Sequence, residues 1–353
     1  MKIMKIGILT FTASDNYGQR LQNYALQEIL LKSGNYVRTI KQSEDSITMF
    51  RLVKLGIKLL IGKEHNWNKL LRKVKFYLFD KKYIKYSRMV DTWNPTKVLN
   101  KKYDKFVSGS DQVWAPIQYR FPMYMQSFAD SSKKYSYAAS IASYDIDANL
   151  KNEYKKYLQD FVCISVREER SKEILEEILD EIEICVDLDP TLLLSRDDWI
   201  RVEKKPKWLN EEEYILAYNL DSDISDELRI YAKDKRLNII SLMKDKSKAY
   251  ISDPAEFVYL IHHASLVYTD SYHGTIFSII FEKIFVHATR NVVVYNMNSR
   301  FDTLFHKLGV NIKDVSSVSA SLNANIYDNL YIRLQEEKKK SLRTINLIAN
   351  HRQ

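Results

Sequence analysis

A histidine that precedes a glycine in a polar turn is the first feature of the sequence that suggests chemistry. Residues 266–268 are apolar and β-inclined, residues 270–274 are predicted to form a turn, and Thr275 is predicted to cap a helix reaching Ile280. Free amides at a helix start attract anions. His273, in this turn, can bind such a group or give it a proton. The alternative is a solvated or structurally hydrogen-bonded histidine.

Two arginines are candidates to bind the anion. Arg167 directly follows a predicted strand at 163–166, and its planar guanidinium can hold a carboxylate or a phosphate through two hydrogen bonds. It can instead form a surface ion pair with Glu168 or Glu169. Arg300, near the start of a later predicted helix, is a further cation.

Two turns in the first half of the chain carry side chains suited to sugar hydroxyls. They follow the predicted strands at 5–11 and 105–107. Tyr17 or Trp114 can stack on a sugar face, although ordinary packing is favoured for Trp114. Asp111 can also act as a general base for an acceptor hydroxyl. The substrate-binding candidates are Asn16, Tyr17, Gly18, Gln19, Ser108, Gly109, Ser110, Gln112, Ser271, Tyr272, Gly274, Thr275 and Arg300.

Three of the chain's 8 glycines, Gly18, Gly109 and Gly274, lie in these turns. Either a ligand approaches the backbone closely there, or the turn itself is tight. The first turn lacks the GxGxxG pattern, so a dinucleotide fingerprint is not supported.

The elements that position these turns alternate between strand and helix along 353 residues. We expect an N-terminal Rossmann-like domain at 1–205, a C-terminal one at 210–325, and a C-terminal helix at 326–353, with the polar segment 203–207 as linker. The predicted fold class is therefore α/β, with two Rossmann-like domains facing each other across a cleft, and a basic helical insertion at 48–89 in the first domain.

The basic insertion accounts for the net charge of +9. Between Arg51 and Arg88 there are twelve lysines or arginines and only two acidic residues. A predicted helix there has one apolar face, formed by Leu70, Leu71, Val74, Tyr77 and Leu78. Its basic surroundings suggest an anionic membrane surface reached through residues 50–90, or a solvated basic face on a packed helix. Nucleic acid is not expected, because no binding motif accompanies the charge.

Composition excludes several other classes. No apolar run reaches the roughly 18 residues that span a bilayer, and the N-terminus reads as a strand, without the cleavage site of a signal peptide. Cys163 and Cys185 lie in apolar surroundings and lack metal-ligand spacing. We therefore expect a protein of a reducing cytoplasm, possessing no structural metal.

Five segments together resemble the polysaccharide pyruvyl transferase family. They occur in the family's order, cover roughly residues 5 to 310, and leave out the basic insertion and the C-terminal helix. They are Asn16-Tyr17-Gly18-Gln19 with Leu21-Gln22 and Tyr24-Ala25-Leu26, Ser108-Gly109-Ser110-Asp111-Gln112-Val113-Trp114, Ser165-Val166-Arg167-Glu168, Asp189-Pro190-Thr191-Leu192-Leu193, and Thr269-Asp270-Ser271-Tyr272-His273-Gly274.

This resemblance implies a GT-B-like fold and a transferase that uses phosphoenolpyruvate (PEP) as donor substrate, with no cofactor. The enolpyruvyl group would move onto two hydroxyls of a lipid-linked or nucleotide-linked sugar, a precursor of capsule or exopolysaccharide. It would form a pyruvate ketal and release phosphate. His273 matches the family's functional histidine, and Arg167 matches its arginine. Many members carry arginine where this chain has Ser271, so that charge must come from Arg167, Arg300 or another basic residue.

Two other functions remain open at this stage. One is a GT-B glycosyltransferase that uses a nucleotide sugar. The other is a non-catalytic sugar-binding or membrane-peripheral assembly protein. The expected location is the cytoplasm, with the basic helix at the inner face of the membrane as one possibility.

Overall fold

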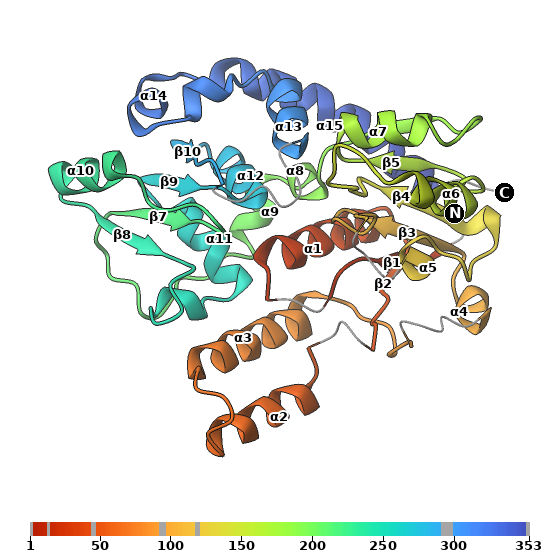
Figure 1. Ribbon diagram of the computed structural model, residues 1–353, viewed down its shortest axis with the longest axis horizontal. Helices are drawn as coiled ribbons and strands as arrows, with labels where there is room; N and C mark the ends of the chain where they lie inside the picture. The colour runs from red at the N-terminus through yellow and green to blue at the C-terminus, as the bar shows by residue number, and fades with distance from the viewer. Residues whose placement is uncertain are drawn as a thin grey trace.

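Parallel strands form two separate four-stranded sheets, as the alternating pattern predicts. The computed structural model describes residues 3–12, 15–43, 47–91, 97–116, 121–290 and 299–350, so Ala13 and Ser14 of the first predicted turn lie outside it. The first sheet has the order β2-β1-β3-β4 and the second the order β10-β9-β7-β8 (Figure 1). Their strands are β1 (Lys5–Leu9), β2 (Tyr36–Thr39), β3 (Lys105–Gly109), β4 (Lys134–Tyr137), β7 (Tyr214–Tyr218), β8 (Asn238–Ser241), β9 (Leu266–Thr269) and β10 (Phe285–His287).

A third, two-stranded sheet extends the first one. Its strands, β5 (Ile164–Val166) and β6 (Ile184–Val186), are also parallel. Isolated bridges join Tyr135 to Cys163 and Ala139 to Val166, so β5 continues the order beyond β4. The carboxyl ends of β1, β3, β4 and β5 consequently share one edge, where parallel α/β sheets place their ligands.

Helices connect the strands of the first sheet. Asn16 caps α1, which ends before Gly34, a residue at φ 82° that favours glycine. The helices of this part are α1 (Tyr17–Lys32), α4 (Lys97–Lys102), α5 (Phe121–Tyr124), η1 (Ser131–Lys133), α6 (Ala148–Leu158), α7 (Glu169–Glu176), α8 (Pro190–Leu193) and α9 (Arg196–Ile200).

The second sheet is connected in the same manner. Asp253 caps α11 with a reciprocal capping box, and Pro254 takes the first helical position. The helices here are α10 (Asp226–Lys235), η2 (Ala249–Ile251), α11 (Pro254–His262), α12 (Tyr272–Ile280), α13 (Ser299–Leu308), η3 (Ile312–Val315) and α14 (Val318–Asn323).

The long helix α15 (Tyr327–Asn350) runs from the second sheet back to the first (Figure 1). Near its end, the backbone oxygen of Ile348 accepts a 2.6 Å hydrogen bond from Lys105 Nζ in β3. The backbone oxygen of Ala349 accepts one from Asn35 at 3.3 Å. The last helix is thereby part of the first domain's core, although residues 210–325 separate it from that domain in sequence.

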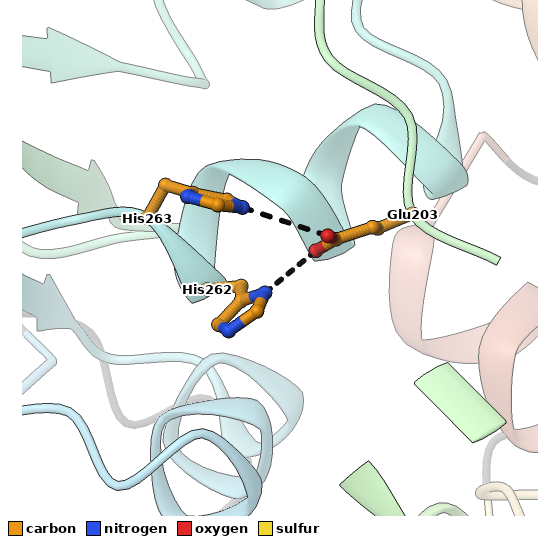
Figure 2. A group of neighbouring side chains, drawn as sticks. All are labelled: Glu203, His262 and His263. Carbon is orange, nitrogen blue, oxygen red and sulfur yellow. Dashed lines mark hydrogen bonds and ion pairs between the residues drawn. The ribbon is translucent and has the colours of Figure 1, made fainter. Parts of the chain in front are cut away.

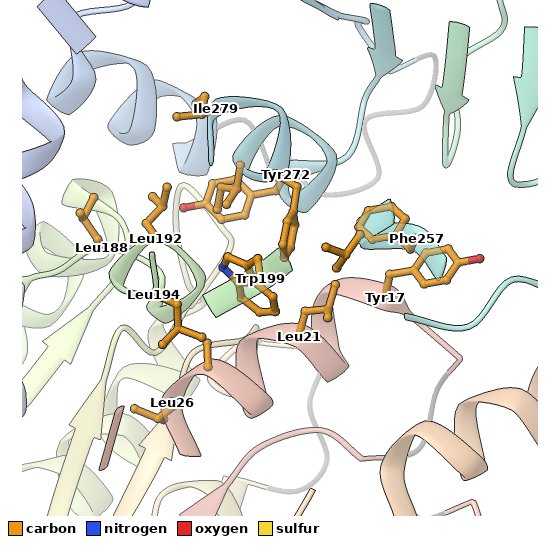
Figure 3. Packing of buried hydrophobic residues seen from close by; sticks show 14 of the residues in the cluster. Tyr17, Leu21, Leu26, Leu188, Leu192, Leu194, Trp199, Phe257, Tyr272 and Ile279 are labelled. Atoms are coloured by element: carbon orange, nitrogen blue, oxygen red, sulfur yellow. The ribbon is translucent and has the colours of Figure 1, made fainter. Parts of the chain in front are cut away.

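A continuous hydrophobic cluster joins the two halves of the chain. Tyr17, in the first turn of α1, stacks on Phe257 of α11 with 4.5 Å between ring centroids (Figure 3). Trp199 of α9 packs edge-on against Phe277 of α12 at 4.8 Å. All four side chains are buried. This packing joins α1 and α9 of the first half to α11 and α12 of the second.

The basic insertion consists of α2 (Met49–Leu60) and α3 (Trp67–Tyr83), which lie at the lower edge of the molecule in Figure 1. Part of the predicted apolar face of α3 is wrong. Leu71 and Leu78 are 46% and 56% exposed, whereas Phe76 and Phe79 are buried. The reason is tertiary, because α3 is covered by both domains at once and turns its aromatic side chains toward them.

Arg72 of α3 ties the insertion to both domains. Its guanidinium donates to the Asp15 carboxylate at 2.9 Å and to the Tyr17 hydroxyl at 2.8 Å in the first domain. It also donates to the backbone oxygen of Tyr250 at 2.6 Å in the second. The Arg72 side chain is 3% exposed, so this is a buried charge with a carboxylate partner and several hydrogen bonds.

Candidate active site

The site is built where the first turns of two helices face each other. Asn16 caps α1 by accepting a hydrogen bond from Gln19 N at 3.2 Å. Ser271 caps α12 by accepting one from Gly274 N at 3.4 Å, so Thr275 is not the cap that the sequence predicts. The prediction placed the helix start four residues late, and His273 is therefore inside the first turn. Because first-turn amides have no intrahelical acceptors, the N-termini of α1 and α12 both contribute positive electrostatic potential to the site.

Gly18 and His273, each the second residue of its helix, are in direct contact. A Cβ built on Gly18 would lie 2.1 Å from His273 Nδ1, much closer than two such atoms can approach. Only glycine leaves room for the ring here. The group that lies against the backbone of Gly18 is therefore the imidazole of His273, whereas the sequence suggested a ligand or a tight turn.

Asp189, which precedes α8, gathers the other groups. Its Oδ2 accepts hydrogen bonds from Arg167 Nη1 at 2.8 Å and Ser110 Oγ at 3.0 Å, and lies 3.5 Å from His273 Nε2. Burial alone would raise the pKa of Asp189, but His273 and Arg167 lower it well below its ordinary value. Asp189 therefore stays ionised. It accepts a hydrogen bond from Arg167 and lies within ion-pair distance of His273, whose Nε2 makes no hydrogen bond among the described residues.

Part of the Arg167 guanidinium group can still donate hydrogen bonds. The side chain is 1% exposed, and its Nε and Nη2 atoms make no hydrogen bond within the part of the chain that the structure describes. Nε lies 3.6 Å from the Glu168 carboxylate, an ion pair that is too long for a good hydrogen bond. Arg167 is thus not the surface residue of the alternative interpretation. It is a buried cation that can donate two further hydrogen bonds.

Tyr272 places a second cation beside the first. Its buried ring lies 4.6 Å from the Arg167 guanidinium and 5.5 Å from that of Arg300. Burial and the neighbouring Arg167 lower the pKa of Arg300 to about 10, so it remains charged at neutral pH. The two guanidinium groups therefore lie on one ring, where both can interact with the same bound anion.

Asp111, at the end of β3, is the second carboxylate of the site. Its Oδ1 accepts a hydrogen bond from Gln112 N at 2.8 Å, whereas Oδ2 is buried without a partner among the described residues. Burial raises the pKa of Asp111, although Arg167, His273 and Arg300 partly oppose this. Environments that push the pKa values of two carboxyl groups apart, Asp111 up and Asp189 down, are typical of acid–base sites.

Arg290 is a cation that the sequence interpretation missed. It follows β10 and donates from Nε and Nη2 to the backbone oxygen of Asp270 at 3.3 and 3.2 Å. This places it next to Ser271, where a positive charge was expected. A signal was present, since Arg290 follows a strand of the second sheet much as Arg167 follows one in the first. Asp270 itself holds the loop at 220–222, whose three backbone amides donate to its carboxylate.

Several predicted binding residues have structural partners instead. Tyr17 is fully buried and its hydroxyl donates to the backbone oxygen of Ser252, so its ring cannot stack on a sugar. Trp114 is also fully buried and donates to the backbone of Tyr124, in agreement with the packing interpretation. Ser108 is bonded to Tyr124 and Gln126.

The other two turn glycines serve packing. A Cβ on Gly109 would meet Leu26 at 2.5 Å, and one on Gly274 would meet the Thr269 side chain at 2.4 Å. Both allow a helix to lie close to a strand. Thr275 is completely buried. Asn16, Gln19 and Gln112 are partly exposed around the site and remain candidates to contact a sugar.

A separate group of side chains has the composition of a metal site. Glu203, at the linker, lies 2.7 Å from His262 Nδ1 and 3.5 Å from His263 Nε2 at the end of α11 (Figure 2). Among the described residues, this is the one group of three or more histidine, cysteine, aspartate or glutamate side chains whose possible metal-binding atoms all lie within 4.8 Å of one another. As it stands, the group is a hydrogen-bonded network between linker and helix, and Arg196 lies 3.2 Å from His262 Nε2. A guanidinium in that position disfavours a cation.

Taken together, the site can bind a small molecule with two anionic groups. Arg167, Arg300 and the amides of two helix starts supply the positive potential. His273 can deliver a proton, and Asp111 can accept one. All of these groups are held by the ends of buried elements, so they are positioned in advance of binding.

Comparison with known proteins supports the fold and assigns a family. A family model described as polysaccharide pyruvyl transferase matches residues 16–290. No curated protein sequence matches. S. aureus MnaA, solved with UDP, superposes with a TM-score of 0.51 at 12% identity and covers 98% of this chain and 96% of its own. The UDP-N-acetylglucosamine 2-epimerase from Rickettsia bellii gives 0.50 at 11% identity, covering 99% and 98%. These likenesses confirm the predicted GT-B-like class of two α/β domains.

Proposed function

The chain belongs to the polysaccharide pyruvyl transferase family, and we propose that it moves the enolpyruvyl group of PEP onto two hydroxyls of a sugar. The products are a pyruvate ketal on a surface-polysaccharide precursor and inorganic phosphate. The observation that carries this proposal is the pair of buried cations, Arg167 and Arg300, on one tyrosine ring beside the His273–Gly18 contact.

PEP has the two anionic groups that the site favours. Nε and Nη2 of Arg167 make no hydrogen bond among the described residues and suit one planar carboxylate or two phosphate oxygens. The helix starts at Tyr17 and Tyr272 suit the phosphate, which accepts several hydrogen bonds. Arg290, beside Ser271, supplies the charge that many family members place at that position.

The transfer needs one proton donor and one acceptor. His273 donates a proton to the methylene carbon of PEP, which becomes a methyl group, and the adjacent carbon becomes cationic. A sugar hydroxyl attacks that carbon and gives its proton to Asp111. The carbon–oxygen bond to phosphate then breaks, the second hydroxyl attacks, and its proton leaves with the departing phosphate. Asp189 stays ionised throughout, accepts a hydrogen bond from Arg167, and lies 3.5 Å from Nε2 of His273.

The acceptor is a lipid-linked or nucleotide-linked sugar in the cytoplasm, where PEP is made. Asn16, Gln19 and Gln112 surround the site with partly exposed amides that fit sugar hydroxyls. None of the helices within the described ranges has the length and apolar character needed to cross a bilayer.

The test is turnover of isotope-labelled PEP by the full chain with a panel of lipid-linked and nucleotide-linked sugars. We expect phosphate release that depends on the acceptor, with label and added mass in an acid-labile product. Hexose transfer from a nucleotide sugar with PEP inert would instead establish a glycosyltransferase. Acceptor binding without any turnover, unaffected by His273→Ala, would establish a non-catalytic sugar-binding protein.

A further inference from the structure

Helix α2 exposes an apolar face that nothing in the described chain covers. Its members are large side chains with exposed fractions between 52% and 76%. The α2 apolar face consists of Met49, Phe50, Val53, Ile57, Leu60 and Ile61. At 100° per residue these six positions fall within an arc of about 120°, so they form one continuous stripe.

The side chains of the α2 apolar face do not pack into the hydrophobic core. A different side of α2 is packed, since Leu52 and Leu59 are 5% and 6% exposed. An ordinary surface helix has one apolar side, which it buries, and a polar remainder. α2 has a second apolar side that faces solvent, and contiguous exposed surfaces of this kind mark interaction sites.

A row of positive charge borders the stripe. Arg51, Lys54 and Lys58 lie next to it around the helix, and Lys63 follows shortly after its end. α2 itself contains no acidic residue. Apolar side chains fringed by cations are complementary to an interface that offers hydrocarbon below a layer of negative charge.

We infer that the α2 apolar face docks into the surface of a membrane rich in anionic phospholipid. The inserted side chains would be those of the stripe, and the basic row would lie among the lipid phosphates. A second copy of the chain fits less well. A symmetric pair through the same face would bring two Arg51-Lys54-Lys58 rows together and place like charges side by side.

The helix hairpin is joined firmly to the rest of the molecule. α3 connects α2 to both domains through Arg72 and through a 2.7 Å ion pair between Lys75 and Glu256 of α11. In Figure 1, α2 is the outermost element on that side. Arg72 also donates to Tyr17, the neighbour of Gly18, so docking would hold the candidate site at a fixed height above the lipid.

This inference goes beyond the proposed reaction and does not depend on PEP. A membrane-docked enzyme would meet lipid-linked acceptors, but the docking itself is measured without turnover. Failure to bind vesicles would leave the pyruvyl transfer untouched, and failure of PEP turnover would leave the docking untouched.

The experiment is co-sedimentation of the full chain with vesicles of phosphatidylcholine alone and with about one quarter phosphatidylglycerol. We expect binding to the anionic vesicles that falls as NaCl rises from about 0.1 to 0.5 M. The variant Phe50→Ser/Leu60→Ser should weaken it by about tenfold or more, because two inserted side chains are lost. Lys54→Glu/Lys58→Glu should weaken it similarly and remove the salt dependence.

The matched control is Ile230→Ser/Ile332→Ser, which changes two side chains exposed at 69% and 60% on other helices. It should bind like the unchanged protein. Equal binding by the α2 variants and the control would overturn the inference. So would an absence of vesicle binding, or a self-association by light scattering that the α2 variants abolish while vesicle binding is unchanged. Far-ultraviolet circular dichroism verifies that each variant is folded.

Discussion

The imidazole of His273 rests on the backbone of Gly18, with no space between them for even one methyl group. Gly18→Ala should therefore displace the ring. Alanine suits a helix better than glycine, so we expect stability to be kept while turnover falls by about 10²-fold, the usual effect of misplacing a reacting group by an ångström. Steady-state kinetics and thermal unfolding on the same sample measure both.

Gly56→Ala is the control for this substitution. Gly56 is also helical, but a Cβ there would meet nothing closer than Leu70 at 3.7 Å. Activity on a water-soluble acceptor should be unchanged. If Gly18→Ala is as active as Gly56→Ala, then His273 has no fixed position that matters to the reaction.

His273→Gln should lower kcat by about 10² or more if this histidine is the proton donor. Glutamine keeps a hydrogen-bonding side chain of similar size, so PEP binding should change much less than kcat. His306→Gln, at an exposed position on α13, should be fully active. A retained kcat for His273→Gln would limit the residue to binding or packing.

Arg167→Lys should raise the KM for PEP by about tenfold or more while leaving the KM for the acceptor nearly unchanged. Lysine keeps the charge but not the planar fork that leaves Nε and Nη2 available. The exposed Arg229→Lys serves as the matched control. An equal rise in both KM values would indicate that Arg167 supports the fold of the site and does not bind the donor.

Asp111→Asn tests the base. Because burial raises the pKa of Asp111, its carboxylate forms at a higher pH than that of an ordinary aspartate, and kcat/KM should rise with pH through that value. The kcat/KM of the variant should be lower by about 10²-fold and should no longer rise with pH in this range. The exposed Asp226→Asn should keep this rise. If kcat/KM of Asp111→Asn rose with pH as it does in the unchanged protein, the rise would be due to the ionisation of another group.

The buried His287 side chain should make the protein less stable in acid. Burial lowers its pKa from 6.5 to about 4, so the unfolded chain takes up a proton at a higher pH than the folded one. The free energy of unfolding should thus fall as pH drops from 6.5 to about 4, by about 2 kcal/mol from this residue. Urea unfolding of the protein and of His287→Phe, measured across that window, should show a smaller fall in the variant.

Most elements were predictable because local patterns and tertiary structure agree. The helix at 299–308 and the capping of α11 by Asp253 follow from residues close together in sequence. Where capping residues compete, the sequence is ambiguous. Ser271 and Thr275 are both good caps, and the fold selects Ser271 because β9 ends at Thr269.

Site contacts between distant segments were not predictable. Asp189 and His273 lie in different domains, and no local pattern indicates that one carboxylate serves both His273 and Arg167. Tyr17 illustrates the opposite error. An aromatic residue in a binding turn suggested sugar stacking, but Phe257, far along the chain, covers its ring.

Arg72 has a mechanical consequence. Rotation of one domain away from the other about the segment 203–207 must break its bonds either to Asp15 and Tyr17 or to Tyr250. Since two partners lie on the first side and one on the second, α3 would swing with the first domain, and Lys75 would release Glu256. A movement that separated the domains would then tilt α2 relative to the second domain, so the angle of the hairpin would depend on the distance between the two domains.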